Sequence, residues 1–171
     1  MKVIFFIITL LFFNIVNSQT INDLLYVKIN KYRKENNQKE LVVCEKAKIS
    51  NTQQLEYMIS TSTVPLDHTQ ITETKYGKTF NSFNERIDYI YGDGYKYVGE
   101  NLIGLYYDKT KNEMVDEIFN LWKNSSGHNE VMLSDEPVCF YINSKVSNKM
   151  IVNGFEYLSD GFIYCVLTTF K

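Results

Sequence analysis

The sequence predicts an α+β fold, because helical patterns come first along the chain and strand patterns come last. In the first part of the chain, apolar residues recur three or four positions apart, which is the spacing of an amphipathic helix. From Val138 to Phe170, β-branched and aromatic residues alternate with polar ones between turn signals, as in antiparallel strands. One further strand pattern lies between these two parts.

The first 18 residues have the pattern of a secretory signal peptide. Lys2 precedes an apolar run from Val3 to Val16, and Ser18 supplies a small residue at the expected cleavage point. The run is shorter than the roughly 20 apolar residues that cross a bilayer. We therefore expect residues 1–18 to be removed and residues 19–171 to form one secreted, extracellular domain without a membrane span.

Four stretches of the mature chain have a helical pattern. They cover residues 21–35, 45–60, 83–91 and 113–124. Thr20 and Asp23 form a capping box at the start of the first stretch, and Asn112 is the expected N-cap of the last. We expect this last helix to end near residues 125–127, which then form a loop.

One strand pattern lies before the last of these helices, and the others follow it. Residues 97–107 form one apolar, aromatic strand candidate. The segment 138–170 contains three turn signals, which predict two or three antiparallel strands. The turn signals are Asn143-Ser144, Ser147-Asn148 and Ser159-Asp160-Gly161.

Three cysteines remain after cleavage, Cys44, Cys139 and Cys165. An exported protein meets an oxidising compartment, so one disulfide and one leftover thiol are expected, with three possible pairings. Cys139 and Cys165 lie in strand segments that can be neighbours in one sheet, which favours their pairing. Cys44 would then be buried and inert, or free for an intermolecular bond.

Charge and composition exclude some classes of partner. The formal net charge is -2, and the mature chain has mixed charges and many tyrosines and phenylalanines. Such a chain has no basic face for a polyanion, so nucleic acid is not an expected partner.

The chain contains only two histidines, His68 and His128, and both fall in segments without helical or strand periodicity. Together with residues around them they resemble the CAP superfamily, which comprises cysteine-rich secretory proteins, antigen 5 and pathogenesis-related proteins and is also called the SCP domain. The segments that carry the resemblance are Asn30-Lys31-Tyr32-Arg33, His68 after a polar loop, Gly99-Glu100-Asn101-Leu102, Trp122, and Ser125 followed by Gly127-His128. The resemblance extends from about Ile21 to Phe170.

This resemblance implies a three-layer α-β-α sandwich with three to four helices around a small antiparallel sheet. It also implies a cleft formed by two histidines and two acidic residues. By position, His68, Glu100 and His128 would be three members of that set. Ser125 stands where the longer members have a glutamate, and the short spacing before His128 is similar to the compact, bacterial-like form of the domain.

Two imidazoles and a carboxylate are ligands that a zinc-type ion accepts. His68, Glu100 and His128 would thus hold a divalent metal such as zinc, with a water activated in an open position. In the alternative interpretation the same groups bond each other or water and hold the loops together without an ion. A serine hydrolase built on Ser125 or Ser126 is disfavoured, because no nucleophile-elbow motif accompanies them.

An aromatic stretch in the irregular part of the chain could line an apolar groove. Its members are Tyr76, Phe80, Phe83, Tyr89, Tyr91, Tyr95 and Tyr97. The family resemblance implies sterol or fatty-acid binding as one use of such a groove. The alternative is that these rings pack in the core or brace loops. Asn124-Ser125-Ser126 is an N-glycosylation sequon near the expected cleft.

Taken together, the sequence predicts a secreted, non-catalytic binding or effector protein of the CAP type. Its expected partner is a lipid or sterol, or an extracellular protein. The competing hypothesis is a metal-assisted hydrolase that uses His68, Glu100 and His128.

Overall fold

The computed structural model describes residues 19–64, 66–72, 77–152 and 154–171, so the expected signal peptide lies outside the described residues. The described helices are α1 (Ile21–Glu35), α2 (Glu45–Thr61), α3 (Phe83–Tyr91), α4 (Lys111–Asn124) and α5 (Ser126–Leu133). The described strands are β1 (Val42–Val43), β2 (Thr63–Val64), β3 (Val98–Tyr106), β4 (Cys139–Val152) and β5 (Phe155–Phe170). In this part of the chain, no helix is long and apolar enough to cross a membrane.

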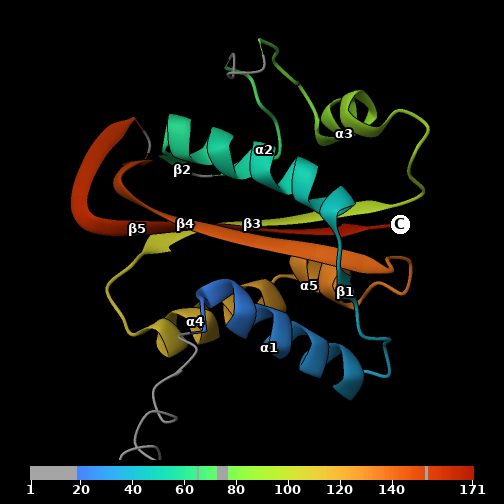
Figure 1. Cartoon of the computed structure of the whole chain (residues 1–171). Coiled ribbons are helices and arrows are strands. Elements are labelled where there is room, and N and C mark those ends of the chain that lie inside the picture. The colour runs from blue at the N-terminus through green and yellow to red at the C-terminus, as the bar shows by residue number, and fades with distance from the viewer. Residues whose placement is uncertain (1–18, 65, 73–76, 153) are drawn as a thin grey trace, which may run out of the picture.

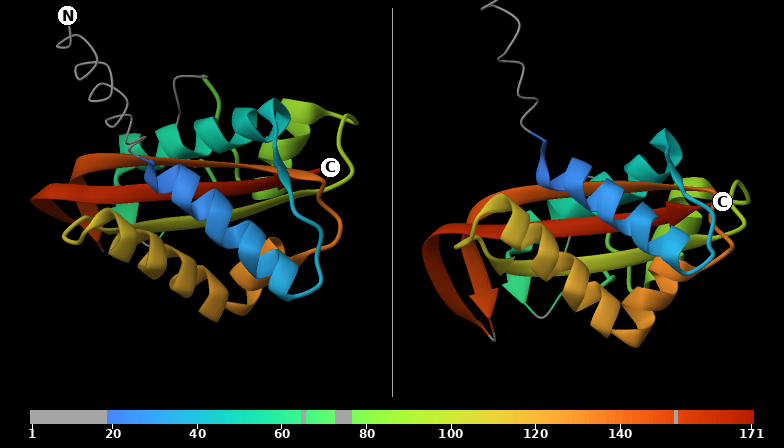
Figure 2. Two further views of the ribbon diagram at one scale, coloured as in Figure 1. Left: turned by 60° about the horizontal axis from the view of Figure 1, so that its bottom comes forward. Right: turned by 90° about the horizontal axis from the view of Figure 1, so that it is seen from below.

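The elements form three layers, with α2 and α3 above the sheet and α1, α4 and α5 below it (Figure 1). Figure 2 shows α1 and α4 lying side by side beneath the sheet. The α+β class and the α-β-α sandwich are thus confirmed. The described chain has five helices rather than three or four, and its sheet is mixed rather than purely antiparallel.

The sheet has the strand order β1-β4-β5-β3. β4 and β5 form a long antiparallel hairpin, β3 lies antiparallel to β5, and the two short strands β1 and β2 run parallel to β4. Two of the three predicted turn signals in the C-terminal segment lie inside β4, and the third lies inside β5. Because β5 has strands on both sides and helices on both faces, every residue from 161 to 170 is buried.

Two apolar clusters hold the helical layers on the sheet. Leu25 and Ile29 of α1 pack with Trp122 of α4 below the sheet, and Leu55 and Met58 of α2 pack above it. The capping box at Thr20 is present as predicted. A second capping box, formed by Thr110 and Glu113, starts α4, so the prediction of Asn112 as its N-cap is wrong.

The helix α5 contradicts the expectation that residues 125–127 form a loop and that His128 lies outside regular structure. Ser125 is a residue type preferred at N-caps and precedes α5 in an extended conformation, but its side chain makes no capping hydrogen bond. The other end of α5 is held by a distant residue: Arg33 Nη1 donates to the carbonyl oxygens of Met132 at 2.6 Å and Ser134 at 2.9 Å. Tertiary contacts therefore define this helix.

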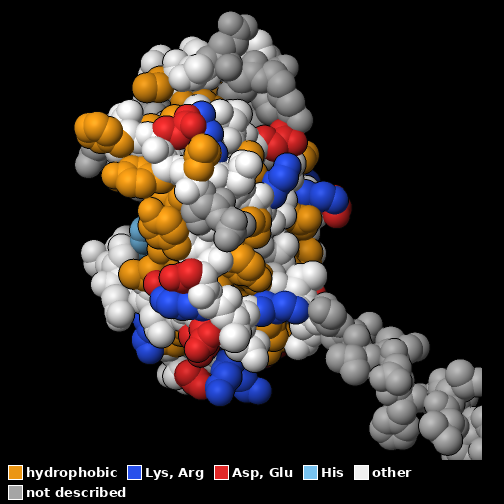
Figure 3. Space-filling model, turned by 90° about the vertical axis from the view of Figure 1, so that its left-hand side faces the viewer, with side chains coloured by type: hydrophobic (Ala, Val, Ile, Leu, Met, Phe, Trp, Pro, Cys, Tyr) orange, Lys and Arg blue, Asp and Glu red, His pale blue; other side chains and the backbone are white. Residues whose placement is uncertain are grey.

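The far end of the β4–β5 hairpin extends past the helices and carries exposed apolar side chains on its surface (Figure 3). Phe155 is 71% exposed and Leu158 is 72% exposed. The hairpin end is far from Glu100 along the sheet. Tyr106, the last residue of β3, pairs with Phe162 near the hairpin end, whereas Glu100 pairs with Thr168.

The disulfide joins Cys44 to Cys139, and Cys165 is a buried free thiol. The prediction of a Cys139–Cys165 bridge is therefore wrong. In the hairpin, Cys139 pairs with Phe170 whereas Cys165 pairs with Ser144, so the two cysteines lie at different points of the register. The parallel pairing of β1 with β4 instead brings Cys44 beside Cys139. Burial raises the pKa of Cys165, which keeps its thiol protonated.

We predict that Cys44→Ala lowers the free energy of unfolding by about 2–5 kcal/mol, because a bridge spanning 95 residues strongly restricts the unfolded chain. Urea unfolding of the oxidised protein measures the loss. Cys165→Ala is the control and should keep the disulfide, which non-reducing peptide mapping detects. A bridge to Cys165 in the peptide map of the parent protein would contradict the assignment.

Candidate functional site

A cleft of about 310 Å³ lies at the edge strand β3. Phe83 from α3 lines one side and Val131 from α5 lines the other, while Gly99 and Glu100 of β3 form its base and His68 stands beside them. Helices from both layers therefore reach this edge of the sheet. A Cβ on Gly99 would lie 2.7 Å from Thr169 Oγ1 and 3.1 Å from Val131 Cγ1, so α5 packs this closely only against glycine.

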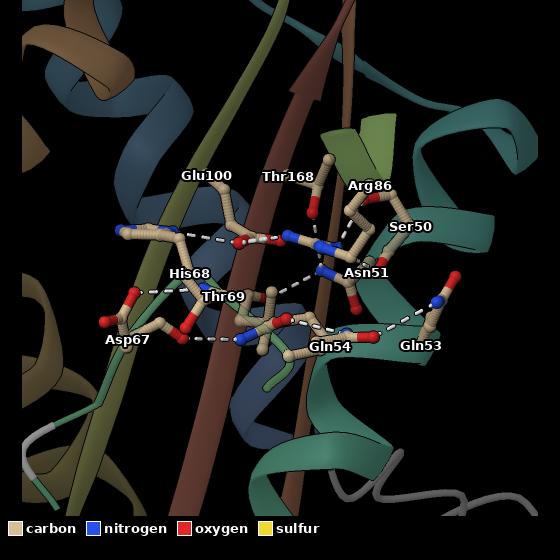
Figure 4. A network of polar contacts seen from close by, with 12 residues as sticks. Ser50, Asn51, Gln53, Gln54, Asp67, His68, Thr69, Arg86, Glu100 and Thr168 are labelled. Carbon is tan, nitrogen blue, oxygen red and sulfur yellow. Dashed lines mark hydrogen bonds and ion pairs between the residues drawn. The ribbon is translucent and has the colours of Figure 1, made fainter. Parts of the chain in front are cut away.

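The Glu100 carboxylate is the polar centre of the cleft. Its side chain is 1% exposed, and its Oε1 lies 2.9 Å from His68 Nδ1 and 2.6 Å from Arg86 Nη2 (Figure 4). An ionised carboxylate is acceptor-only, so neutral His68 donates through Nδ1–H and keeps Nε2 as an acceptor. The His68 side chain is 40% exposed and lines the cleft. The site therefore offers the Nε2 lone pair to a ligand.

Arg86 balances the buried charge of Glu100. The sequence-based prediction of the site did not include Arg86. Its side chain is 0% exposed, and Nη1 also donates to Ser50 Oγ of α2 at 3.0 Å. The signal was present: within the predicted helix 83–91, Arg86 adjoins Ile87, and both lie on the buried face. A charged residue on the apolar face of a short helix calls for an opposite charge within the fold.

A buried amide network holds the loop that carries His68 (Figure 4). Gln54 Nε2 donates to the carbonyl oxygen of Asp67 at 2.9 Å. Gln70 Nε2 donates to Gln54 Oε1 at 2.9 Å, and Gln53 Nε2 donates to Gln70 Oε1 at 3.2 Å. Because these side chains are buried and bonded to one another, they fix the residues on both sides of His68 against α2.

His128 lies on α5, close to His68. Asn101 Nδ2 donates to the His128 carbonyl oxygen at 2.9 Å and so ties the start of α5 to β3. Burial lowers the pKa of the His128 imidazole, and the nearby charge of His68 lowers this pKa further. His128 is therefore held neutral to lower pH than an ordinary histidine.

These positions do not fit the predicted three-ligand metal centre. In the described chain, no three His, Cys, Asp or Glu side chains converge closely enough to hold a metal ion. Arg86 Nη2 and His68 Nδ1 both contact the same carboxylate oxygen, Glu100 Oε1. This oxygen and His68 Nδ1 are therefore already engaged with each other. The metal site built on His68, Glu100 and His128 stays a prediction from resemblance.

The predicted aromatic groove separates into different environments, although Tyr76 lies outside the described residues. Phe83 and Tyr97 line the cleft. Phe80 is fully buried, Tyr89 packs on it, and Tyr91 and Tyr95 belong to the cluster around Phe170. Of the described rings, then, two serve the cleft and the others brace the fold. Asn124 is exposed at the end of α4, near the cleft residue Gly127.

No protein-family model matches the sequence, and no curated protein matches it. Solved structures do match. An outer surface protein of Borrelia burgdorferi is 19% identical with a TM-score of 0.55, over 88% of this chain and 92% of that one. A cysteine-rich secretory protein of Staphylococcus aureus is 15% identical with a TM-score of 0.52, over 88% of this chain and 38% of that one.

A third matching structure contains an SCP domain. It is an extracellular protein containing an SCP domain from Bacillus anthracis, 14% identical with a TM-score of 0.54, over 88% of this chain and 40% of that one. The chain has the CAP fold. The expectation drawn from the sequence motifs is thereby confirmed for the fold. The chain spans about two fifths of the Staphylococcus and Bacillus proteins.

We predict that breaking the Glu100–Arg86 pair destabilises the CAP domain more than replacing the whole pair. Glu100→Leu or Arg86→Met leaves one buried charge without its partner and should cost about 3–5 kcal/mol of unfolding free energy. The double variant Arg86→Met with Glu100→Leu should cost less than the sum of the two single changes. Urea unfolding of the three variants measures the coupling.

The exposed pair of Lys149 and Glu156, 2.6 Å apart, is the matched control. Glu156→Gln should change the unfolding free energy by no more than about 1 kcal/mol, because water screens this pair. Additive costs for Arg86 and Glu100 would contradict a buried, coupled pair.

The lowered pKa of His128 predicts a loss of stability in mild acid. As pH falls below about 6.5, the unfolded chain takes up this proton before the folded protein does, so the free energy of unfolding decreases until the folded pKa is passed. Unfolding of the parent and of His128→Asn between pH 8 and pH 5 measures the slope. The variant should lose less stability over this range, and equal slopes would exclude His128 as the cause.

Proposed function

We propose that this CAP-fold chain is a non-catalytic extracellular binding protein whose cleft holds one end of a small, lipid-like amphiphile. The observation that carries the proposal is the imidazole of His68, which Glu100 orients through Nδ1, beside walls formed by Phe83, Tyr97 and Val131. An apolar pocket with few fixed polar groups is the usual form of a small-molecule site. A hydroxyl on an apolar body would satisfy both features.

The size of the cleft limits what it can enclose. Its volume of about 310 Å³ is at the lower end of ligand pockets. A whole sterol or long acyl chain would exceed it. We therefore assign to the cleft the polar end of such a molecule and its first few carbons, with the remainder lying along the surface.

The residues around the cleft support binding rather than catalysis. Among the described residues that line it, none is Ser, Thr, Cys or Lys, the side chains that most often act as nucleophiles. Glu100 Oε1 already contacts Arg86 and His68, and the buried charge of Arg86 makes this carboxylate a weaker general base. The disulfide and the outer-surface and extracellular descriptions of the structural neighbours support an extracellular site of action.

Binding of a long-chain alcohol to the purified chain tests the proposal. With 1-decanol as probe, we expect chemical-shift changes at Phe83, Tyr97 and Val131 and saturable binding in a titration. His68→Leu keeps the bulk but removes the acceptor, and should weaken binding roughly tenfold, the worth of about one hydrogen bond. Val131→Trp should fill the cleft and abolish binding.

Tyr89→Ser is the control, because Tyr89 is an exposed aromatic residue of the same stretch that does not line the cleft. It should bind the alcohol as the parent does. Absence of binding by the parent would overturn the lipid-like ligand and leave an extracellular protein as the partner to be sought.

A further inference from the structure

We propose that Arg86 sets the charge selectivity of the cleft, so that the cleft takes a neutral, hydroxyl-bearing ligand in preference to carboxylates, amines or divalent metal ions. This inference rests on the proposed binding function and specifies its ligand class. Its basis is the contact between Arg86 Nη2 and Glu100 Oε1, which are 2.6 Å apart on side chains 0% and 1% exposed.

The charges of Arg86 and Glu100 neutralise each other inside the protein, away from solvent. Between buried groups the attraction is screened far less than at a surface, so a counter-ion or metal ion would have to compete with a guanidinium that already balances the Glu100 charge. Ser50 Oγ, 3.0 Å from Arg86 Nη1, holds the guanidinium from the side opposite to β3. The Phe83 ring centroid lies 5.3 Å from the Arg86 guanidinium carbon, so the wall of the cleft packs on the same group.

The other ionisable groups near the cleft add little to the electrostatic potential inside it. His128 is not among the described residues that line the cleft, and the further carboxylate there is Glu130 at the exposed rim. Water and salt screen an exposed carboxylate over about 8–10 Å. The paired Arg86 and Glu100 therefore add no net charge to the interior of the cleft.

A neutral cleft discriminates through desolvation. A carboxylate or an ammonium would leave water without gaining a charged partner, which costs far more than the transfer of a hydroxyl. An alcohol loses little, because its O–H can donate to His68 Nε2. A divalent metal ion would have to compete with Arg86 for the Glu100 carboxylate, of which only Oε2 accepts no hydrogen bond from a described residue.

Three probes with the same alkyl chain separate these cases: 1-decanol, decanoate and decylammonium, each titrated at pH 8 and constant ionic strength. The parent should bind the alcohol at least tenfold more tightly than either ion. Glu100→Gln leaves Arg86 unbalanced and should shift the preference toward decanoate by at least tenfold. Arg86→Met leaves Glu100 unbalanced and should shift it toward decylammonium by at least tenfold.

A Zn²⁺ titration followed by calorimetry gives a readout independent of the amphiphiles. The parent and Glu100→Gln should bind zinc equally weakly, whereas Arg86→Met should bind it more tightly than either. If a single variant fails to fold, the double variant Arg86→Met with Glu100→Gln is again neutral and should keep the preference for the alcohol. Lys149→Met and Glu156→Gln remove the same charges at an exposed pair and should leave all preferences unchanged.

The outcomes separate the two proposals. A parent that binds amphiphiles but prefers an ion, or that binds zinc at least tenfold more tightly than Glu100→Gln, would overturn the role of Arg86 and leave the binding function standing. A parent that binds none of the three probes would overturn the binding function and, with it, the selectivity.

Discussion

The ion pair between Glu100 and Arg86 is the contact on which the cleft depends. Burying either charge alone would cost several kcal/mol, so each side chain requires the other in the folded state. The pair joins the edge strand β3 to α3, a helix of nine residues in the least regular part of the chain. It also presents a carboxylate oxygen to His68 Nδ1, which fixes the direction of the imidazole. Fold stability and ligand recognition therefore rest on the same carboxylate.

The alternation of side chains along β3 explains why Gly99-Glu100-Asn101-Leu102 forms a unit. Neighbouring residues of a strand face opposite sides of the sheet. Glu100 reaches Arg86 in the upper layer, Asn101 donates to the His128 carbonyl in the lower layer, and the Leu102 carbonyl accepts from Trp122 Nε1 at 3.3 Å. Four consecutive residues thus hold both helical layers on one strand, a structural reason for the motif that requires no catalysis.

The sequence was sufficient where the controlling interactions are local. The capping box at Thr20 and the helical spacing of apolar residues predicted α1 closely, and the strand pattern of residues 97–107 predicted β3. Features held by distant partners were missed. Helix α5 depends on Arg33, about a hundred positions away, and the Cys44–Cys139 bridge depends on the parallel pairing of a two-residue strand. The motif located His68, Glu100 and His128, but Arg86 lies outside the motif; its place on the buried face of a helix signalled a buried partner of opposite charge without identifying it as Glu100.

The position of Arg86 shows that the chemistry of a CAP-fold cleft depends on side chains outside the motif. The structural neighbours share at most 19% of their residues with this chain, so their likeness establishes the backbone and not the side chains around the cleft. A His and a Glu in the expected positions are compatible with a metal ligand set, with a proton-transfer pair or with an oriented hydrogen-bond acceptor. The distinction lies in what else contacts the carboxylate. Here that group is a buried guanidinium from a helix with no motif of its own, and its contact with Glu100 Oε1 favours the role of Glu100 as a support for His68.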